Sequence, residues 1–226
     1  MDEKSMQFAN FNITFGENDA PMLKHFSDII FPAFSGDYIR GKRDSVPRYF
    51  FAGVEIKEVD NEYVMVGNFI KETQYKVVTT VQEGVLASTP ADVPTAPYSR
   101  FIVFLKNHRM VLVRNETASP DTRSFQSTVR DILNQYVRNA NRERSERDKL
   151  PIAIANIVDI PLKDSIADVL KNVNKVSWFK LRFFPLNNDL DPGPLTQHIR
   201  EDMKKSGARQ QILCLTLQIL KTEFQR

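Results

Sequence analysis

The sequence predicts an α+β protein with a mixed β-sheet, built from antiparallel N-terminal strands and a C-terminal ββαβαβαβ unit. Residues 49–88 are rich in β-branched and aromatic side chains, as strands are. After residue 98, strand and helix patterns alternate, which implies crossover connections and a partly parallel sheet. At 226 residues and 42% hydrophobic composition the chain can bury a sizeable core, and its 16 phenylalanines make that core aromatic-rich.

The N-terminal half opens with a strand and a helix. "FANFNITFG" (8–16) alternates apolar and polar residues, which predicts a strand that ends at Gly16. Apolar residues in 20–34 recur at helical spacing, and Pro32 is expected to end or kink that helix. A loop is predicted over 36–50. The expected strands of the β-rich block span 49–59, 62–72 and 74–88, with a tight hairpin between the first two.

Residues 89–99 contain three prolines, which favours a loop or linker. This segment is the best internal boundary in the chain. It separates a β-rich N-terminal subdomain, 1–92, from an α/β C-terminal subdomain, 93–226, unless the two form one continuous domain.

The C-terminal half begins with "RFIVFLKNHRMVLVRN" (100–115), which predicts two strands around a polar turn. The first of these strands is apolar on both faces, so we expect it to be central. A long helix follows, with Ser119 as its N-cap and Pro120 at its first position. Its apolar stripe comprises Phe125, Val129, Ile132, Leu133, Tyr136 and Val137. The remaining expected elements are a central buried strand over 150–160, helices over 164–173 and 193–207, and strands over 175–186 and 209–220.

Composition and motifs restrict the function classes. The single Cys214 excludes an internal disulfide framework and a cysteine zinc site, and it fits a reducing, cytoplasmic compartment. The N-terminus has no signal-peptide pattern, and no apolar run approaches the roughly 20 residues that span a bilayer. Phosphate-binding, nucleotide-binding, hydrolase and zinc-protease motifs are missing, and the three histidines are scattered. We therefore expect a non-catalytic protein without a cofactor and without a membrane partner.

The candidate binding residues are cations. Basic and aromatic residues interleave in "YIRGKRDSVPRYFF" (38–51), and this combination suits phosphate neutralisation and base stacking. A solvated loop with its aromatic side chains anchored in the core explains the same pattern. With cations from the hairpin turn and the long helix, the predicted DNA or RNA contacts are Arg40, Lys42, Arg43, Arg48, Lys106, Arg109, Arg123 and Arg130.

Two other functions remain open from the sequence. A metal-dependent nuclease would use carboxylates at a strand end, and Asp159, followed by Lys163 and Asp164, is the best acidic candidate. Asp164 also fits a helix N-cap. A structural assembly subunit would pair an exposed apolar edge strand, such as 209–220, with a protein partner or a second copy in a homo-oligomer.

The later part of the chain, roughly residues 98–220, resembles a group of poorly characterised bacterial proteins of abortive infection and phage defence. Three motifs carry the resemblance: "FIVFLKNHRMVLVRN", then "SPDTRSFQSTVRDIL", and later "LRFFPLN" before a helix and a strand. The resemblance implies a cytoplasmic accessory or effector of an antiviral system, and it supplies no catalytic residues.

Overall fold

The computed structural model describes residues 4–42, 45–82, 84–160, 179–183 and 211–215. It divides the chain into two units, residues 1–159 and residues 160–226. Within the second unit, strands β9 (Phe179–Phe183) and β10 (Gln211–Leu215) form an antiparallel pair. These two strands lie within the ranges expected from the sequence. The expected helices over 164–173 and 193–207 lie outside the described residues.

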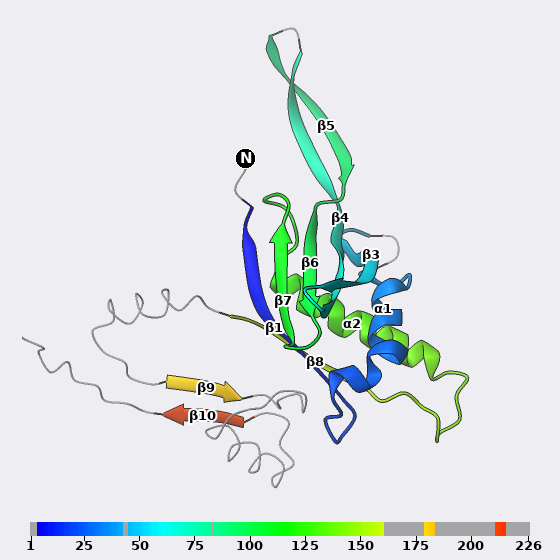
Figure 1. Ribbon diagram of the computed structural model, residues 1–226. Coiled ribbons are helices and arrows are strands. Elements are labelled where there is room, and N and C mark those ends of the chain that lie inside the picture. Colours follow the sequence, from blue (N-terminus) through cyan, green and yellow to red (C-terminus); the bar gives the residue numbers. More distant parts are fainter. Residues whose placement is uncertain (1–3, 43–44, 83, 161–178, 184–210, 216–226) are drawn as a thin grey trace, which may run out of the picture. The chain divides into compact units, whose positions relative to one another are not determined.

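The first unit is built on one eight-stranded sheet, which curls into a half-barrel (Figure 1). Along the sheet the strands lie in the order β2, β3, β4, β6, β7, β1, β8, and β5 pairs with the outer part of β4. The strands are β1 (Met6–Phe15), β2 (Ile39–Arg40), β3 (Arg48–Val59), β4 (Glu62–Gln82), β5 (Val85–Thr95), β6 (Tyr98–Phe104), β7 (Arg109–Arg114) and β8 (Ala153–Asp159).

The described part of the chain is mostly β-sheet, and every strand pairing in it is antiparallel, so the predicted α+β fold with a mixed, partly parallel sheet is wrong. The cause is the position of the N-terminal strand. The chain does run β7, helix, β8, but β1 inserts between β7 and β8 and pairs with both in the antiparallel sense. Among the described strands, β8 therefore pairs with β1 alone and is an edge strand, not the central strand that its apolar composition predicted.

Strand β4 is longer than either of the two strands that were predicted in this region, 62–72 and 74–88. Its first half pairs with β3 and β6, and residues 73–82 continue beyond the sheet and pair with β5. Residues 73–95 thus form a two-stranded arm that projects from the body (Figure 1). The expected loop over 89–99 lies largely in β5, and the expected boundary at residue 92 falls within this strand. Its prolines are compatible with pairing because an edge strand tolerates them.

Tight turns keep neighbouring strands in register. The β3–β4 hairpin predicted from the sequence is confirmed, and its central residues Asp60 and Asn61 have φ of +51° and +61°. This left-handed pair is the geometry that matches the twist of a two-residue hairpin. The β6–β7 turn uses His108 at φ +54°, and the carbonyl of His108 accepts a 2.7 Å hydrogen bond from the Phe11 amide.

Helical segments differ from the prediction mainly at their ends. The segment expected over 20–34 comprises a 3-10 turn (Met22–His25), a π turn (Phe26–Ile30) and helix α1 (Phe31–Ser35). Pro32 does not end it, because it lies in the first turn of α1, where its missing amide proton costs no bond. Helix α2 spans Thr122–Ala140, and none of the helices among the described residues is long and apolar enough to cross a membrane.

The N-cap of α2 is Asp121, not Ser119 as predicted. The Asp121 carboxylate accepts a 2.8 Å hydrogen bond from the Ser124 amide. Burial alone would raise the pKa of Asp121, but the Ser124 hydrogen bonds and the charge of Arg114 outweigh it and hold that pKa below its usual value. Ser119 instead donates its hydroxyl to the Tyr98 carbonyl at 2.7 Å, which ties the loop before α2 to strand β6.

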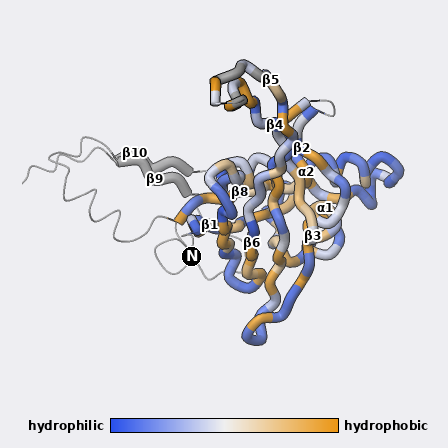
Figure 2. The backbone as a smooth tube through the Cα atoms, turned by 90° about the horizontal axis from the view of Figure 1, so that it is seen from above, coloured by the Kyte–Doolittle hydropathy of each residue, from blue (hydrophilic) through white to orange (hydrophobic). Residues whose placement is uncertain are grey.

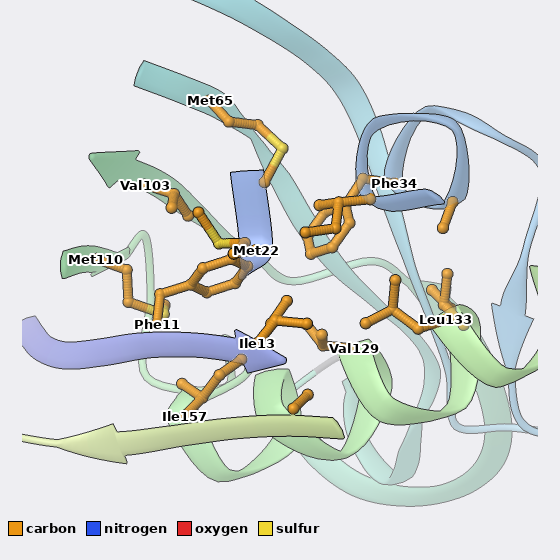
Figure 3. Packing of buried hydrophobic residues seen from close by; sticks show 14 of the residues in the cluster. Phe11, Ile13, Met22, Phe34, Met65, Val103, Met110, Val129, Leu133 and Ile157 are labelled. Carbon is orange, nitrogen blue, oxygen red and sulfur yellow. The ribbon is translucent and has the colours of Figure 1, made fainter. Parts of the chain in front are cut away.

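The core lies between the concave face of the sheet and the helices α1 and α2 (Figure 3). Phe125 of α2 is fully buried at its centre, with ring centroids of Phe51, Phe69 and Phe101 at 5.2, 5.3 and 5.4 Å. The predicted apolar stripe of α2 is confirmed, since all its members are buried except Tyr136, which is partly buried. An aromatic core of this kind fixes which face of each strand points inward.

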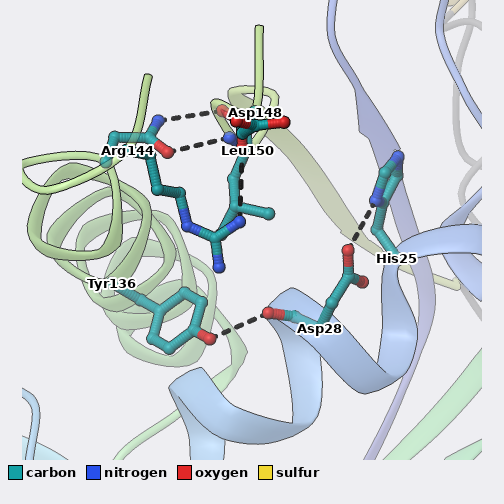
Figure 4. Close-up of polar contacts among 7 residues, drawn as sticks. His25, Asp28, Tyr136, Arg144, Asp148 and Leu150 are labelled. Carbon is teal, nitrogen blue, oxygen red and sulfur yellow. Dashed lines mark hydrogen bonds and ion pairs between the residues drawn. The ribbon is translucent and has the colours of Figure 1, made fainter. Parts of the chain in front are cut away.

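Polar contacts fasten the far end of α2 (Figure 4). The Tyr136 hydroxyl donates to the Asp28 carbonyl at 2.8 Å, and burial raises the pKa of this tyrosine. The Asn141 side chain both donates to the Leu150 carbonyl and accepts from the Leu150 amide, at 3.0 and 2.8 Å. The segment from α2 to β8 is therefore held at both of its ends.

Candidate nucleic-acid interface

The loop at 40–48 does meet the long helix. The Arg40 Nε donates to Thr128 Oγ1 of α2 at 2.8 Å, and its guanidinium lies 4.1 Å from the centre of the Tyr49 ring. The Gln135 amide donates to the Ile39 carbonyl at 3.0 Å. These contacts join β2 to α2, but they also engage the Arg40 guanidinium within the fold.

Two other predicted cations form ion pairs. Arg48 makes a two-pronged contact with Glu72, with Nε to Oε2 at 2.9 Å and Nη2 to Oε1 at 2.7 Å. Lys106 pairs with Glu62 at 2.7 Å, and this hydrogen bond with the nearby negative charge raises the lysine pKa. An acceptor carboxylate beside each cation reduces its attraction for phosphate.

These two ion pairs mark opposite ends of the sheet. Glu72 and Glu62 both lie on β4, ten residues apart, which is about 33 Å of extended strand. The turn that carries Lys106 and Arg109 is therefore remote from the 40–48 loop. The predicted residues do not form one continuous basic patch.

Arg40 and the two predicted cations of α2 lie on opposite flanks of this helix. Thr128 faces β2 and Arg40, whereas the Arg130 Nε donates to the Ala155 carbonyl of β8 at 2.9 Å. Thr128 and Arg130 are two positions apart, which is a rotation of about 200° around the helix axis, so their contacts lie on opposite sides of α2. Arg123 is exposed and, seven residues before Arg130, shares its flank. Lys42 is exposed, and Arg43 lies outside the described residues.

The acidic candidate is only partly described. Asp159 is exposed at the end of β8, where it pairs in register with Ala9 of β1. Lys163 and Asp164 lie outside the described residues. Among the residues that the structure describes, no three His, Cys, Asp or Glu side chains gather as a metal site.

The convex face of the sheet carries a different set of side chains. Because β-strand side chains alternate, the residues between buried core positions point outward. On β6 the core residues Phe101 and Val103 leave Arg100, Ile102 and Phe104 on the outer face. The pairing registers then define three rows from β4 through β6 and β7 to β1: Val64–Phe104–Arg109–Asn10, Val66–Ile102–Val111–Phe8 and Asn68–Arg100–Val113–Met6.

Arg109 stands between two aromatic side chains in this grid. Its direct cross-strand neighbour is Phe104 on β6, and Phe8 of β1 lies on its other side, one row away. Strand spacings of about 4.8 Å and a rise of about 3.3 Å per residue place the two aromatic residues about 12 Å apart. Phe8 is 45% exposed and Met6 59% exposed, so the β1 side of the grid is open.

The charged side chains in these three rows are all positive. The charged residues are Arg100 and Arg109, both exposed, and the rows contain no carboxylate. We define these twelve residues as the outer-face grid. The exposed ring of Phe8 and the partly buried ring of Phe104 lie beside arginines, which gives planar stacking groups together with phosphate ligands.

Sequence reasoning identified only Arg109 within this grid and missed Phe8, Arg100 and Phe104. One signal was present, since the apolar character of both faces of residues 101–105 is what puts Phe104 on the surface. The prediction that this strand is central is confirmed, because β6 lies between β4 and β7. Phe8 could not be added, because its proximity to Arg109 depends on the pairing of β1 with β7.

No protein-family model, curated protein or solved structure matches this chain. The resemblance to phage-defence proteins therefore stays a prediction from three sequence motifs.

Proposed function

We propose that this chain is a non-catalytic protein that binds single-stranded nucleic acid on its outer-face grid. The observation that carries the proposal is the placement of Arg109 between Phe104 and the exposed Phe8, in a set of three rows that contain no carboxylate. Unpaired bases stack on aromatic faces, and arginine guanidinium groups neutralise the phosphates between them. The cations at 40–48 have a smaller part, because Arg40 and Arg48 are engaged inside the fold.

The size of the grid sets the length of nucleic acid that it holds. Three strand spacings from β4 to β1 span about 14 Å. Sheet surfaces of this width stack two or three bases, and such stacking tolerates any base sequence. DNA and RNA are both expected to bind. Duplexes are expected to bind weakly, because their bases are already stacked.

The sequence resemblance supplies a cellular setting for this activity. An accessory component of a bacterial antiviral system, acting in the cytoplasm, would meet single-stranded intermediates of phage genomes or transcripts. The absence of a His-, Cys-, Asp- or Glu-rich cluster among the described residues gives no support to nuclease chemistry at this face.

Fluorescence anisotropy with a labelled homopyrimidine oligonucleotide of about 12 nucleotides tests the proposal. Each phosphate neutralised on a single strand contributes about −0.7 to the slope of log affinity against log salt. With Arg100 and Arg109 engaged we expect a slope near −1.4. Arg109→Ala should reduce its magnitude by about 0.7, and Phe8→Ala should weaken binding by about 5- to 150-fold through loss of stacking.

Lys106→Ala is the matched control. This lysine lies three residues from Arg109 at the tip of the same hairpin, but it pairs with Glu62. Its removal should leave affinity within about twofold of the wild type, as for a screened surface ion pair. A wild-type chain without measurable affinity at low salt would contradict the proposal. If Lys106→Ala lowers the affinity as much as Arg109→Ala does, the assignment of nucleic-acid binding to the outer-face grid is contradicted.

A further inference from the structure

The arm, residues 73–95, carries several large apolar side chains that are open to solvent. Tyr75, Val78 and Val81 on β4 are 68%, 64% and 70% exposed, and Val85 and Val93 on β5 are also exposed. Hydrophobic colour recurs along the arm in Figure 2. A two-stranded hairpin is marginally stable alone in water, and exposed apolar side chains gathered on one element mark an interaction surface. The arm therefore has the properties of a docking element.

The two edges of the arm differ. The β5 edge contains Pro90 and Pro94, which lack the amide protons that a ladder needs. The β4 edge, residues 73–82, contains neither proline nor glycine, and its single charge is Lys76. Pairing of β3 with β4 stops at Glu72, so among the described residues no strand occupies this edge. Within the arm, the β4 edge is therefore the one that can accept a strand, over about 33 Å.

We propose that this edge pairs with the same edge of a second copy of the chain, antiparallel and about a two-fold axis at Val78. In this register Val78 lies opposite its own copy, and Tyr75 lies opposite Val81. Both pairs match exposed apolar side chains. Lys76 falls opposite Thr80, so the single charge of the edge does not meet itself.

Two alternative registers, with the two-fold axis at Lys76 or at Val77, are poorer. The proposed assembly is also closed. An axis at Lys76 would set the two lysines directly opposite one another, which is unfavourable. An axis at Val77 would pair Tyr75 with Thr79 and separate the apolar side chains. The resulting four-stranded ribbon has only the two β5 edges outside, and their prolines block further addition. The expected product is a dimer, not a fibre.

Sedimentation velocity on the full chain without nucleic acid tests the inference separately from the proposed function. An interface this narrow lies at the small end of protein interfaces, so we expect a concentration-dependent dimer between about 1 and 200 µM. Val78→Lys and Val78→Glu each put like charges on the two-fold axis. Each should weaken the dimer at least about tenfold. A 1:1 mixture of the two variants should restore it, because opposite charges then meet.

Val85→Lys is the matched control, at a valine of similar exposure on the other strand of the arm. It should dimerise as the wild type does, and unchanged circular dichroism will show that all variants fold. A wild-type chain that stays monomeric over the whole range would overturn the proposal and assign the edge to another partner. So would a dimer unaffected by Val78→Lys, a mixture that fails to reassociate, or loss of the dimer in Val85→Lys.

Discussion

Two phenylalanines, Phe125 of helix α2 in the core and Phe8 on the convex face of the sheet, give a direct comparison of core and surface. Phe125 is fully buried among five other rings, and Phe8 is 45% exposed on the outer-face grid. A buried phenylalanine removes about 200 Å² from water, which at about 25 cal/mol per Å² is about 5 kcal/mol. Residual burial in the unfolded chain lowers this, so Phe125→Ala should cost about 3–5 kcal/mol.

Phe8→Ala should cost much less. Roughly half of its ring is already in water, and its removal leaves no enclosed cavity, so we expect a loss of about 1–2 kcal/mol. At about 2–4 °C per kcal/mol for a chain of this size, Tm should fall by about 10 °C for Phe125→Ala and by about 4 °C for Phe8→Ala.

Urea unfolding followed by far-ultraviolet circular dichroism measures both variants on one scale. The same two proteins then enter the nucleic-acid binding assay. Phe8→Ala should fold well and bind poorly. Equal destabilisation by the two substitutions would refute the reasoning, since it would mean that the convex face is as buried as the core.

Two further predictions concern elements that position the strands. Asp121→Ala should destabilise the protein by about 1 kcal/mol through loss of the N-cap bond to Ser124. Because the folded pKa of Asp121 is lowered, its stabilisation is present above the unfolded pKa and is lost as pH falls through the folded value; the variant's deficit in urea unfolding should therefore shrink in acid. Gly67→Ala should cost about 1–3 kcal/mol, because the added methyl would lie 2.8 Å from the Phe101 ring. A variant that unfolds at the wild-type urea concentration would contradict this packing.

Local patterns predicted those parts of the fold that depend on neighbouring residues. The stripe of α2 follows a 3.6-residue period, and the β3–β4 hairpin follows from two residues that tolerate positive φ. The helix cap was missed by two residues because Ser119 and Asp121 are both good caps. What separates them is that the Ser119 hydroxyl is held by the Tyr98 carbonyl, a contact from a distant strand.

Sheet direction and the candidate site were missed for one common reason. Both depend on β1 entering between β7 and β8. These pairings join residues 99–107 and 138–150 positions apart and leave no local pattern. Without them, the order β7, α2, β8 implies a parallel pair. Without the pairing of β1 with β7, nothing places Phe8 near Arg109. Cations near one another in sequence were chosen instead, and the fold sends Arg48 and Lys106 to opposite ends of the sheet.

Ultraviolet crosslinking of the chain to a single-stranded oligonucleotide, with the crosslinked peptides identified by mass spectrometry, tests the central claim most directly. Stacked aromatic side chains on the outer-face grid should be the attachment points. We expect crosslinks in the β1 peptide at Phe8 and in the β6 peptide at Phe104, both lost in excess salt. Crosslinks confined to the 40–48 loop or to α2 would contradict it.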